Sequence, residues 1–243
     1  LVKCYITDDK KVGVCVEVNC ETDFVARSDQ FIALIDNIAK HIAQSNAQTV
    51  EAVLEEAYYA DNGKTVAVLI AEATAAIGEK ISLRRFTKYT LTEAGIIASY
   101  IHMGGKIGVM VEASKGASSE VVHDVALQIA AANSQYVTRD EVPQAEVEHE
   151  KEILKAQAMN EDSKKPEAII EKMLVGRINK FYKEVCLTEQ VFVKNPDITI
   201  AQYLKQNGDV TVIRFTRYAM GEGLQKREDD FVGEVMAQAH LNK

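Results

Sequence analysis

The chain has 243 residues, of which 47% are hydrophobic and 26% charged, so it is long enough for one large or two ordinary domains with hydrophobic cores. Its 36 acidic and 28 basic residues give a net charge of -8, which disfavours direct binding to the phosphate backbone of nucleic acids. The longest apolar runs, residues 65–70 and 95–98, are far shorter than the roughly 20 residues that cross a bilayer, which excludes a transmembrane helix.

The cysteines and the first residues of the chain indicate the cellular compartment. No CxxC pair occurs, and no histidine stands at zinc-finger spacing from a cysteine. We therefore expect no bound metal, and reduced thiols at Cys4, Cys15, Cys20 and Cys186. Residues 1–5 lack the features of a secretory signal and do not begin with Met, which suggests a processed or trimmed chain that is not secreted. The expected compartment is a bacterial cytoplasm or an organellar matrix or stroma.

An internal repeat gives the most information about architecture. The sequence KVGVCVEV at residues 11–18 returns as KIGVMVEA at residues 106–113, and both are rich in β-branched residues, as strands are. A later strand, RFTKY at residues 85–89, returns as RFTRY at residues 214–218. Each copy thus has a strand, a helical stretch and a returning strand. The helical stretches include residues 38–43 and 125–130.

This order predicts an α+β fold of two repeated subdomains, each with a small antiparallel sheet covered on one face by helices. We place the subdomains at residues 1–103 and 104–243, with Gly104 and Gly105 forming a hairpin turn. The other elements expected in the first copy are two helices and two strands, at about residues 50–59, 65–77, 81–90 and 96–102.

The second copy carries a long insertion at about residues 147–184. Its apolar residues recur at i, i+3 and i+4, which is typical of amphipathic helices, and a polar break ending at Pro166 divides them into two. We expect a protruding antiparallel coiled-coil hairpin. A terminal helix is expected at about residues 226–240, after a turn at Gly221 and Gly223.

The first copy has additional residues between its strand and its helix, within the segment 19–29. There the apolar Phe24 follows the acidic Asp23 in a loop that the second copy lacks. One interpretation makes Phe24 a surface anchor. The other makes it a core residue of its own subdomain, beside a helix cap supplied by Thr22 or Asp29.

Residues 16–27, VEVNCETDFVAR, resemble the signature of the elongation factor Ts family. Shorter similarities extend the resemblance over nearly the whole chain, at residues 100–109, 171–181, 221–223 and 230–231. The resemblance implies guanine-nucleotide exchange on the translation GTPase elongation factor Tu, bound in its GDP or nucleotide-free form. It also implies that the loop wedges into the GTPase domain and disturbs its magnesium and phosphate site. The wedge residues would be Thr22, Asp23, Phe24 and Val25.

A second contact with elongation factor Tu is implied by similarity at His102, Phe192 and Val193. From the residues alone, His102 could be a structural histidine, and Phe192 and Val193 could be core. Lys194 departs from the apolar residue expected in the family. Family members also begin with a small three-helix module, and nothing before Lys11 resembles it.

Enzymatic function is not supported by any motif. Gly104-Gly105-Lys106 lacks the remaining residues of a phosphate-binding loop, and His149 lacks the second histidine of a zinc protease motif. We expect no catalytic residues and no cofactor. The alternative from another class is a structural or ribosome-associated protein that docks through the coiled coil. Because a coiled coil can form within one chain or between two, a homodimer stays an open alternative.

Overall fold

A computed structural model of the chain describes residues 1–161 and 167–224. The elements of the first half are, in order, β1 (Val2–Ile6), β2 (Val12–Asn19), α1 (Asp23–Ala26), α2 (Asp29–Gln44), α3 (Val50–Glu55), β3 (Ala57–Tyr58), β4 (Asp61–Thr65), α4 (Val66–Ile77) and β5 (Ser82–Thr90). Those of the second half are β6 (Gly95–His102), β7 (Ile107–Ser114), α5 (Ser119–Ala132), η1 (Arg139–Glu141), α6 (Gln144–Glu161), α7 (Glu167–Val185), η2 (Leu187–Glu189), β8 (Val191–Phe192), β9 (Asn195–Thr199), α8 (Ile200–Gln206) and β10 (Val212–Ala219).

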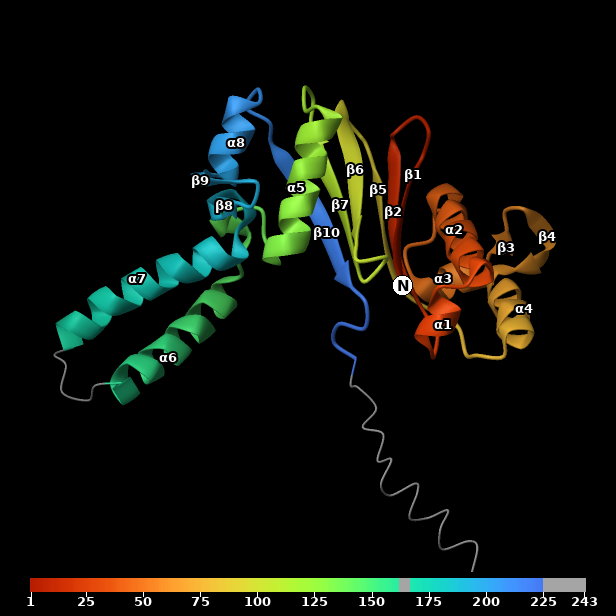
Figure 1. Ribbon diagram of the computed structural model, residues 1–243, viewed down its shortest axis with the longest axis horizontal. Coiled ribbons are helices and arrows are strands. Elements are labelled where there is room, and N and C mark those ends of the chain that lie inside the picture. The colour runs from red at the N-terminus through yellow and green to blue at the C-terminus, as the bar shows by residue number, and fades with distance from the viewer. Residues whose placement is uncertain (162–166, 225–243) are drawn as a thin grey trace, which may run out of the picture.

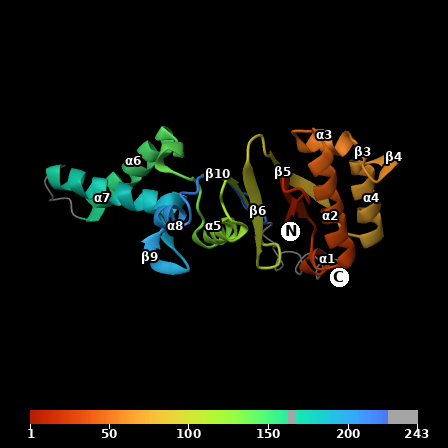
Figure 2. The same cartoon turned by 90° about the horizontal axis from the view of Figure 1, so that it is seen from above.

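Two three-stranded antiparallel sheets form the centre of the molecule, with strand orders β1-β2-β5 and β6-β7-β10. They lie next to each other between helices, α2 packing outside the first sheet and α5 outside the second (Figures 1 and 2). The fold therefore mixes helices with small antiparallel sheets, as predicted.

The middle strand of each sheet is buried on both faces. In β2, the side chains of Val14, Val16 and Val18 join the core under α2, whereas Cys15 faces the second sheet. Because successive side chains of a strand point to opposite faces, a strand covered on both sides needs a nearly continuous apolar run, interrupted in β2 by Glu17, whose buried carboxylate is paired with Arg84 and Arg85. This explains the KVGVCVEV sequence and its counterpart in β7.

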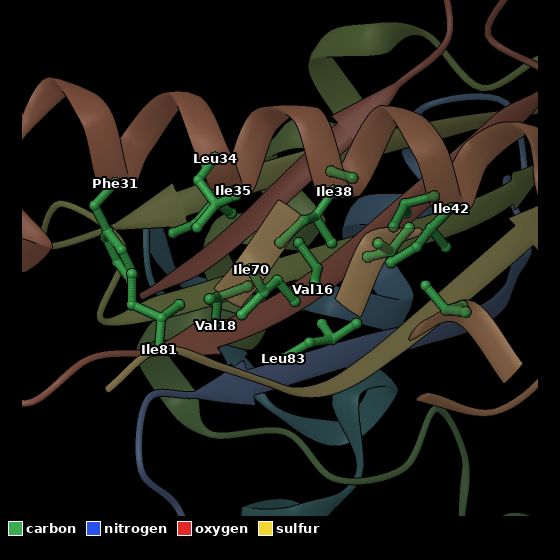
Figure 3. Close-up of a cluster of buried hydrophobic side chains, with 14 of the residues drawn as sticks. Val16, Val18, Phe31, Leu34, Ile35, Ile38, Ile42, Ile70, Ile81 and Leu83 are labelled. Carbon is green, nitrogen blue, oxygen red and sulfur yellow. The ribbon is translucent and has the colours of Figure 1, made fainter. Parts of the chain in front are cut away.

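Helix α2 covers the first sheet with one apolar stripe. The Ser28 hydroxyl caps the helix by accepting a hydrogen bond from the Phe31 N–H at 3.3 Å. Phe31, Ile35, Ile38 and Ile42 then recur at helical spacing and point onto the strands (Figure 3). Burying each such side chain stabilises the fold by about 1.5–3 kcal/mol.

The two sheets approach closely because equivalent glycines stand in both middle strands. A Cβ atom on Gly13 would lie 2.7 Å from both the Ile97 Cγ2 and the Met110 Sδ atoms. One on Gly108 would collide with Val2. The glycine shared by the KVGV and KIGV sequences is thus a packing requirement, met once in each sheet.

The returning strands contact each other reciprocally across this interface. The guanidinium group of Arg85 lies 4.1 Å from the ring centroid of Tyr218, and that of Arg214 lies 4.1 Å from the ring centroid of Tyr89. The hydroxyl oxygens of Thr87 and Tyr218 are 2.6 Å apart, and those of Thr216 and Tyr89 are 2.7 Å apart. The RFTKY and RFTRY motifs therefore pack against each other through matching contacts.

Some elements differ from the expectations. Strand β1, the β3–β4 hairpin and the β8–β9 hairpin were not anticipated, and the helix expected at residues 50–59 ends at Glu55 because β3 begins at Ala57. The division expected at residue 103 falls within the β6–β7 hairpin, whereas strand pairing changes from one sheet to the other between Thr90 and Gly95.

The insertion forms two helices, α6 and α7, which pack against each other and extend away from the sheets (Figure 1). A buried cluster that includes Val142, Val147, Val185 and Cys186 fixes their base. Whether the pair acts as a coiled coil stays a prediction. The helix expected at residues 226–240 lies outside the described residues. Among the described residues, no helix combines the length and apolarity that crossing a bilayer requires.

Candidate functional site

The additional residues after β2 form a short helix rather than an open loop. The Thr22 hydroxyl oxygen accepts a hydrogen bond from the Val25 N–H at 3.3 Å, so Thr22 is the N-cap of α1. Ser28 then caps α2, and its hydroxyl also donates to the Val25 carbonyl at 2.8 Å. Asp29, the other cap considered from the sequence, is the first residue of α2 itself.

Phe24 is the outermost residue of α1. Ala26 is buried and Val25 packs against the core under α2, so the one-turn helix leaves the Phe24 side chain facing solvent, 83% exposed. The interpretation of Phe24 as a core residue is therefore wrong. The ring therefore contributes little to the hydrophobic core of this chain.

Asp23 lies beside Phe24 on the same turn. Its carboxylate is 3.2 Å from an Arg27 guanidinium nitrogen, and both side chains are largely exposed. An exposed ion pair of this kind contributes between about 0 and 1 kcal/mol, so the carboxylate is free to exchange Arg27 for another ligand.

The turn before α1 is fastened to a distant segment by Glu79. One carboxylate oxygen accepts from the Glu21 and Thr22 backbone N–H groups at 3.1 and 2.9 Å, and the other from the Thr22 hydroxyl at 2.6 Å. These hydrogen bonds, that of the Thr22 hydroxyl first, lower the pKa of Glu79 below its ordinary value. Sequence reasoning missed Glu79, whose only local signal is Gly78, the left-handed C-cap of α4.

A groove of about 630 Å³ adjoins α1. Its walls come from the turn before α1, the turn between β6 and β7, and the segment after β10. The exposed apolar side chains along it are Met103, Met220 and Leu224. Three parts of the chain that are far apart in sequence thus meet next to α1, where Asp23, Ala26 and Arg27 also line the groove.

The second set of candidate partner-binding residues, His102, Phe192 and Val193, does not lie together in the structure. His102 ends β6 next to Met103, and its Nδ1 atom lies 3.1 Å from the Tyr100 hydroxyl. Phe192 is buried against Tyr203, with ring centroids 4.4 Å apart, whereas Val193 is 47% exposed. Strand β8, which contains Phe192, lies on the far side of α5 from β6 (Figures 1 and 2). The structure therefore places His102 one residue before the groove residue Met103, with its ring against Tyr100, and keeps Phe192 and Val193 apart from the groove.

Lys194 forms an ion pair with Asp124 of α5, whose other carboxylate oxygen accepts from the Tyr203 hydroxyl at 3.0 Å. This pair gives Lys194 a structural partner within its own subdomain. Among residues 1–161 and 167–224, no group of three or more His, Cys, Asp and Glu side chains is arranged to hold a metal ion.

Comparison with known proteins identifies the family. The family model for elongation factor Ts matches residues 21–222 of this chain, which include α1, strand β5 of the first sheet and the whole second sheet. Elongation factor Ts of Halothermothrix orenii is 46% identical over 242 residues, covering 98% of this chain and 79% of that protein. Elongation factor Ts of Clostridium botulinum is 46% identical over 252 residues, covering 100% and 81%, and that of Clostridium kluyveri is 45% identical over 247 residues, covering 98% and 80%.

The aligned region spans almost the entire chain, and the family model covers most of it, including the VEVNCETDFVAR segment from Glu21 onwards. The similarity that the short motifs indicated is therefore confirmed at full length. The chain belongs to the elongation factor Ts family of translation elongation factors.

Proposed function

We propose that this chain is a guanine-nucleotide exchange factor for elongation factor Tu, and that α1 is the element that promotes GDP release. Membership of the elongation factor Ts family supports the partner and the reaction. The observation that carries the mechanism is the exposed Phe24 ring on a capped, fastened turn.

The wedge works because its binding energy is available in only one state of the partner. Burying a Phe side chain contributes about 2 kcal/mol, and this is gained only where the GTPase domain opens a pocket for the ring. In the proposed mechanism that opening displaces the groups that bind magnesium and phosphate. Asp23, which exchanges Arg27 for a partner group, adds negative charge beside the site that binds the phosphates.

The wedge and the nucleotide then weaken one another. If the factor lowers the affinity of elongation factor Tu for GDP by some ratio, GDP lowers the affinity for the factor by the same ratio. GDP or GTP at sufficient concentration therefore displaces the factor from elongation factor Tu. The partner is bound in its GDP or nucleotide-free form, and no chemical bond changes, so the function needs neither catalytic residues nor a cofactor.

The second subdomain supplies a further contact in this proposal. Val193 is exposed in the turn between β8 and β9, and His102 ends β6 one residue before the groove residue Met103, so each can face a different part of the partner. Phe192 acts from the core, by holding β8 against α8. We propose residues 1–103 and 104–243 as the two subdomains, with β6 at the end of the first completing the sheet of the second. We propose a bacterial cytoplasm or an organellar matrix or stroma as the compartment.

The alternative is a protein that docks on the ribosome or on a second copy of itself through α6 and α7. Exposed apolar side chains on this pair favour it, namely Ile153, Ile169 and Val175. A shallow apolar depression also lies between the two helices, next to Leu174 and Ile178. The two hypotheses place the binding energy on different elements, which lie on opposite sides of the two sheets in Figure 1.

Release of labelled GDP from elongation factor Tu separates the hypotheses. The intact chain should accelerate release, and the double variant Asp23→Ala, Phe24→Ala should lose most of that acceleration while staying folded. Val68→Ala, which truncates an exposed apolar side chain of α4, is a matched control and should behave like the unsubstituted chain. Failure of the folded, intact chain to accelerate release would contradict the proposed function.

A further inference from the structure

We propose that Glu79 is a positioning residue for nucleotide exchange, because its carboxylate fixes the turn that aims Phe24 at the partner. The proposal rests on the proposed function of α1 and adds a residue that lies more than 50 positions away in the sequence. Glu79 does not need to touch the partner. It acts by holding Thr22 and the backbone on either side of it.

The contact is a three-point attachment. Both backbone N–H groups of Glu21 and Thr22 converge on one carboxylate oxygen, at 3.1 and 2.9 Å, while the Thr22 hydroxyl reaches the other at 2.6 Å. A carboxylate is the only side chain that offers acceptors at both oxygens. Hydrogen bonds to an ionised acceptor are also stronger than those between neutral groups.

The carboxylate also sets the direction of the Thr22 hydroxyl. Because an ionised carboxylate can only accept, the hydroxyl must donate its proton to Glu79. Its lone pairs are then left for the Val25 N–H, at 3.3 Å. The helix cap of α1 and the attachment to Glu79 therefore share the Thr22 hydroxyl, and loss of the carboxylate frees both the turn and the direction of this hydroxyl.

The carboxylate is itself held in place by α4. Val66 and Ile70 anchor this helix in the core under α2, and Gly78 ends it at φ +84°, a conformation that reverses the chain. Glu79 follows directly, so it projects from a fixed point towards the strand end that leads into α1.

The second subdomain provides an internal comparison. Counting back equally far from Arg85 and from its counterpart Arg214 places Gly208 opposite Glu79. Among the described residues, no short helix stands between β7 and α5, and the carboxylate at this turn, that of Asp209, accepts no hydrogen bond from the segment after β7. The short helix and a carboxylate hydrogen-bonded to the turn before it thus occur together in the first copy, whereas the described part of the second copy has neither.

Fluorescence measures the positioning itself. The chain contains no tryptophan, so Phe24→Trp introduces a single reporter at the tip of α1. In this background Glu79→Ala should increase the mobility of the indole, seen as lower anisotropy at unchanged lifetime. Glu72→Ala is the matched control on α4, where Glu72 binds Lys64 at 2.7 Å instead of the turn, and it should leave anisotropy unchanged. Equal anisotropy in the Glu79→Ala variant and its parent would overturn the proposal.

The functional consequence is measured in chains that retain Phe24. Glu79→Ala should slow GDP release from elongation factor Tu about tenfold or more, as expected for a misplaced group. Glu79→Gln, which keeps one acceptor oxygen, should give a rate of GDP release between those of Glu79→Ala and the unsubstituted chain. Thr22→Val should resemble Glu79→Ala, and the double variant should be no slower than either alone, because both break one network.

Additive losses from Thr22→Val and Glu79→Ala, or full exchange activity in a folded Glu79→Ala chain, would contradict the positioning role. If the unsubstituted chain itself does not accelerate release, the proposed function fails. The anisotropy comparison still decides whether Glu79 holds the turn, so the two failures can be distinguished.

Discussion

Phe24 and Phe31 are seven positions apart but have opposite roles. Phe31 is fully buried under α2, whereas Phe24 is 83% exposed. Phe24→Ala should therefore change the free energy of unfolding by less than about 0.5 kcal/mol, since exposed truncations away from special features cost little. Phe31→Ala should cost about 3–5 kcal/mol. Urea unfolding of both variants checks this difference, and a large cost for Phe24→Ala would show that its ring packs within the chain.

Glu17 joins the two halves of the molecule through a buried carboxylate. It accepts hydrogen bonds from the Arg84 and Arg85 guanidinium groups, at 2.9 and 2.7 Å, and from the Gly221 N–H at 2.9 Å. Burial alone would raise the pKa of Glu17, but the hydrogen bond from Gly221 and those from the two arginines outweigh it, so the pKa is lowered.

A lowered pKa in the folded state makes this carboxylate a source of stability at neutral pH. The stabilisation is present above the unfolded pKa, about 4.3 for Glu, and is lost as pH falls through the lowered pKa of the folded state. Glu17→Gln should lower the free energy of unfolding by about 1–3 kcal/mol at pH 7 and make it less sensitive to acid. Denaturant titrations between pH 7 and pH 3 measure both, and an unchanged acid sensitivity would contradict the assignment.

For single residues, the sequence indicates which side chains are unusual better than it indicates where they lie in the fold. The unusual pairing of Asp23 and Phe24 is evident in the sequence, but its two interpretations differ only in which way one turn faces. That direction depends on Val25 and Ala26 packing inward. Glu79 could not be found because its partners, Glu21 and Thr22, lie 58 and 57 positions earlier in the chain and become its neighbours only in the folded structure.

Among the elements, the middle strands depend on their glycines. A methyl group at position 108 of β7 would collide with Val2 of the other sheet, so Gly108→Ala should destabilise the fold by about 1–3 kcal/mol through overpacking. Gly176 in α7 has open space around it and ordinary helical geometry. Gly176→Ala should stabilise by up to about 1 kcal/mol. Thermal unfolding of the two variants should shift in opposite directions, and shifts of the same sign would refute the interpretation of the interface.

The helical arm can be shortened without touching the sheets. Lys151 and Lys155 of α6 line the same depression as Val175 and Ile178 of α7, so removing residues 156–174 and closing with a short Gly-Ser turn keeps paired helices at the base. The exchange proposal expects GDP release to continue at a similar rate in this variant. Loss of activity in a folded, shortened chain would favour docking through the arm.

The elements that repeat were predictable, and those that do not repeat were less so. Strands β2, β5, β7 and β10 were expected because each has a sequence counterpart. Strand β1 has a weak pattern of its own and exists because it pairs with β2 and covers Gly108 of β7. The short β3–β4 and β8–β9 hairpins depend on packing against α4 and α8, which no local pattern shows.

On the scale of the whole molecule, the two sheets are joined by contacts that occur in pairs. The arginine and tyrosine of each returning strand stack on their counterparts in the other strand, and the middle strands each supply a glycine. Such an interface resists sliding, because one displacement would break both sets of contacts. It therefore gives α1 and the exposed Val193 fixed positions relative to each other, on opposite sides of the sheets.

A thermodynamic cycle with elongation factor Tu tests the central claim most directly. The affinity of this chain for elongation factor Tu is measured with and without GDP, and the affinity for GDP with and without the chain. The account predicts that the two ratios are equal and large, and that Phe24→Ala reduces both together. Binding of the intact chain with equal affinity to the GDP-bound and nucleotide-free forms would contradict it.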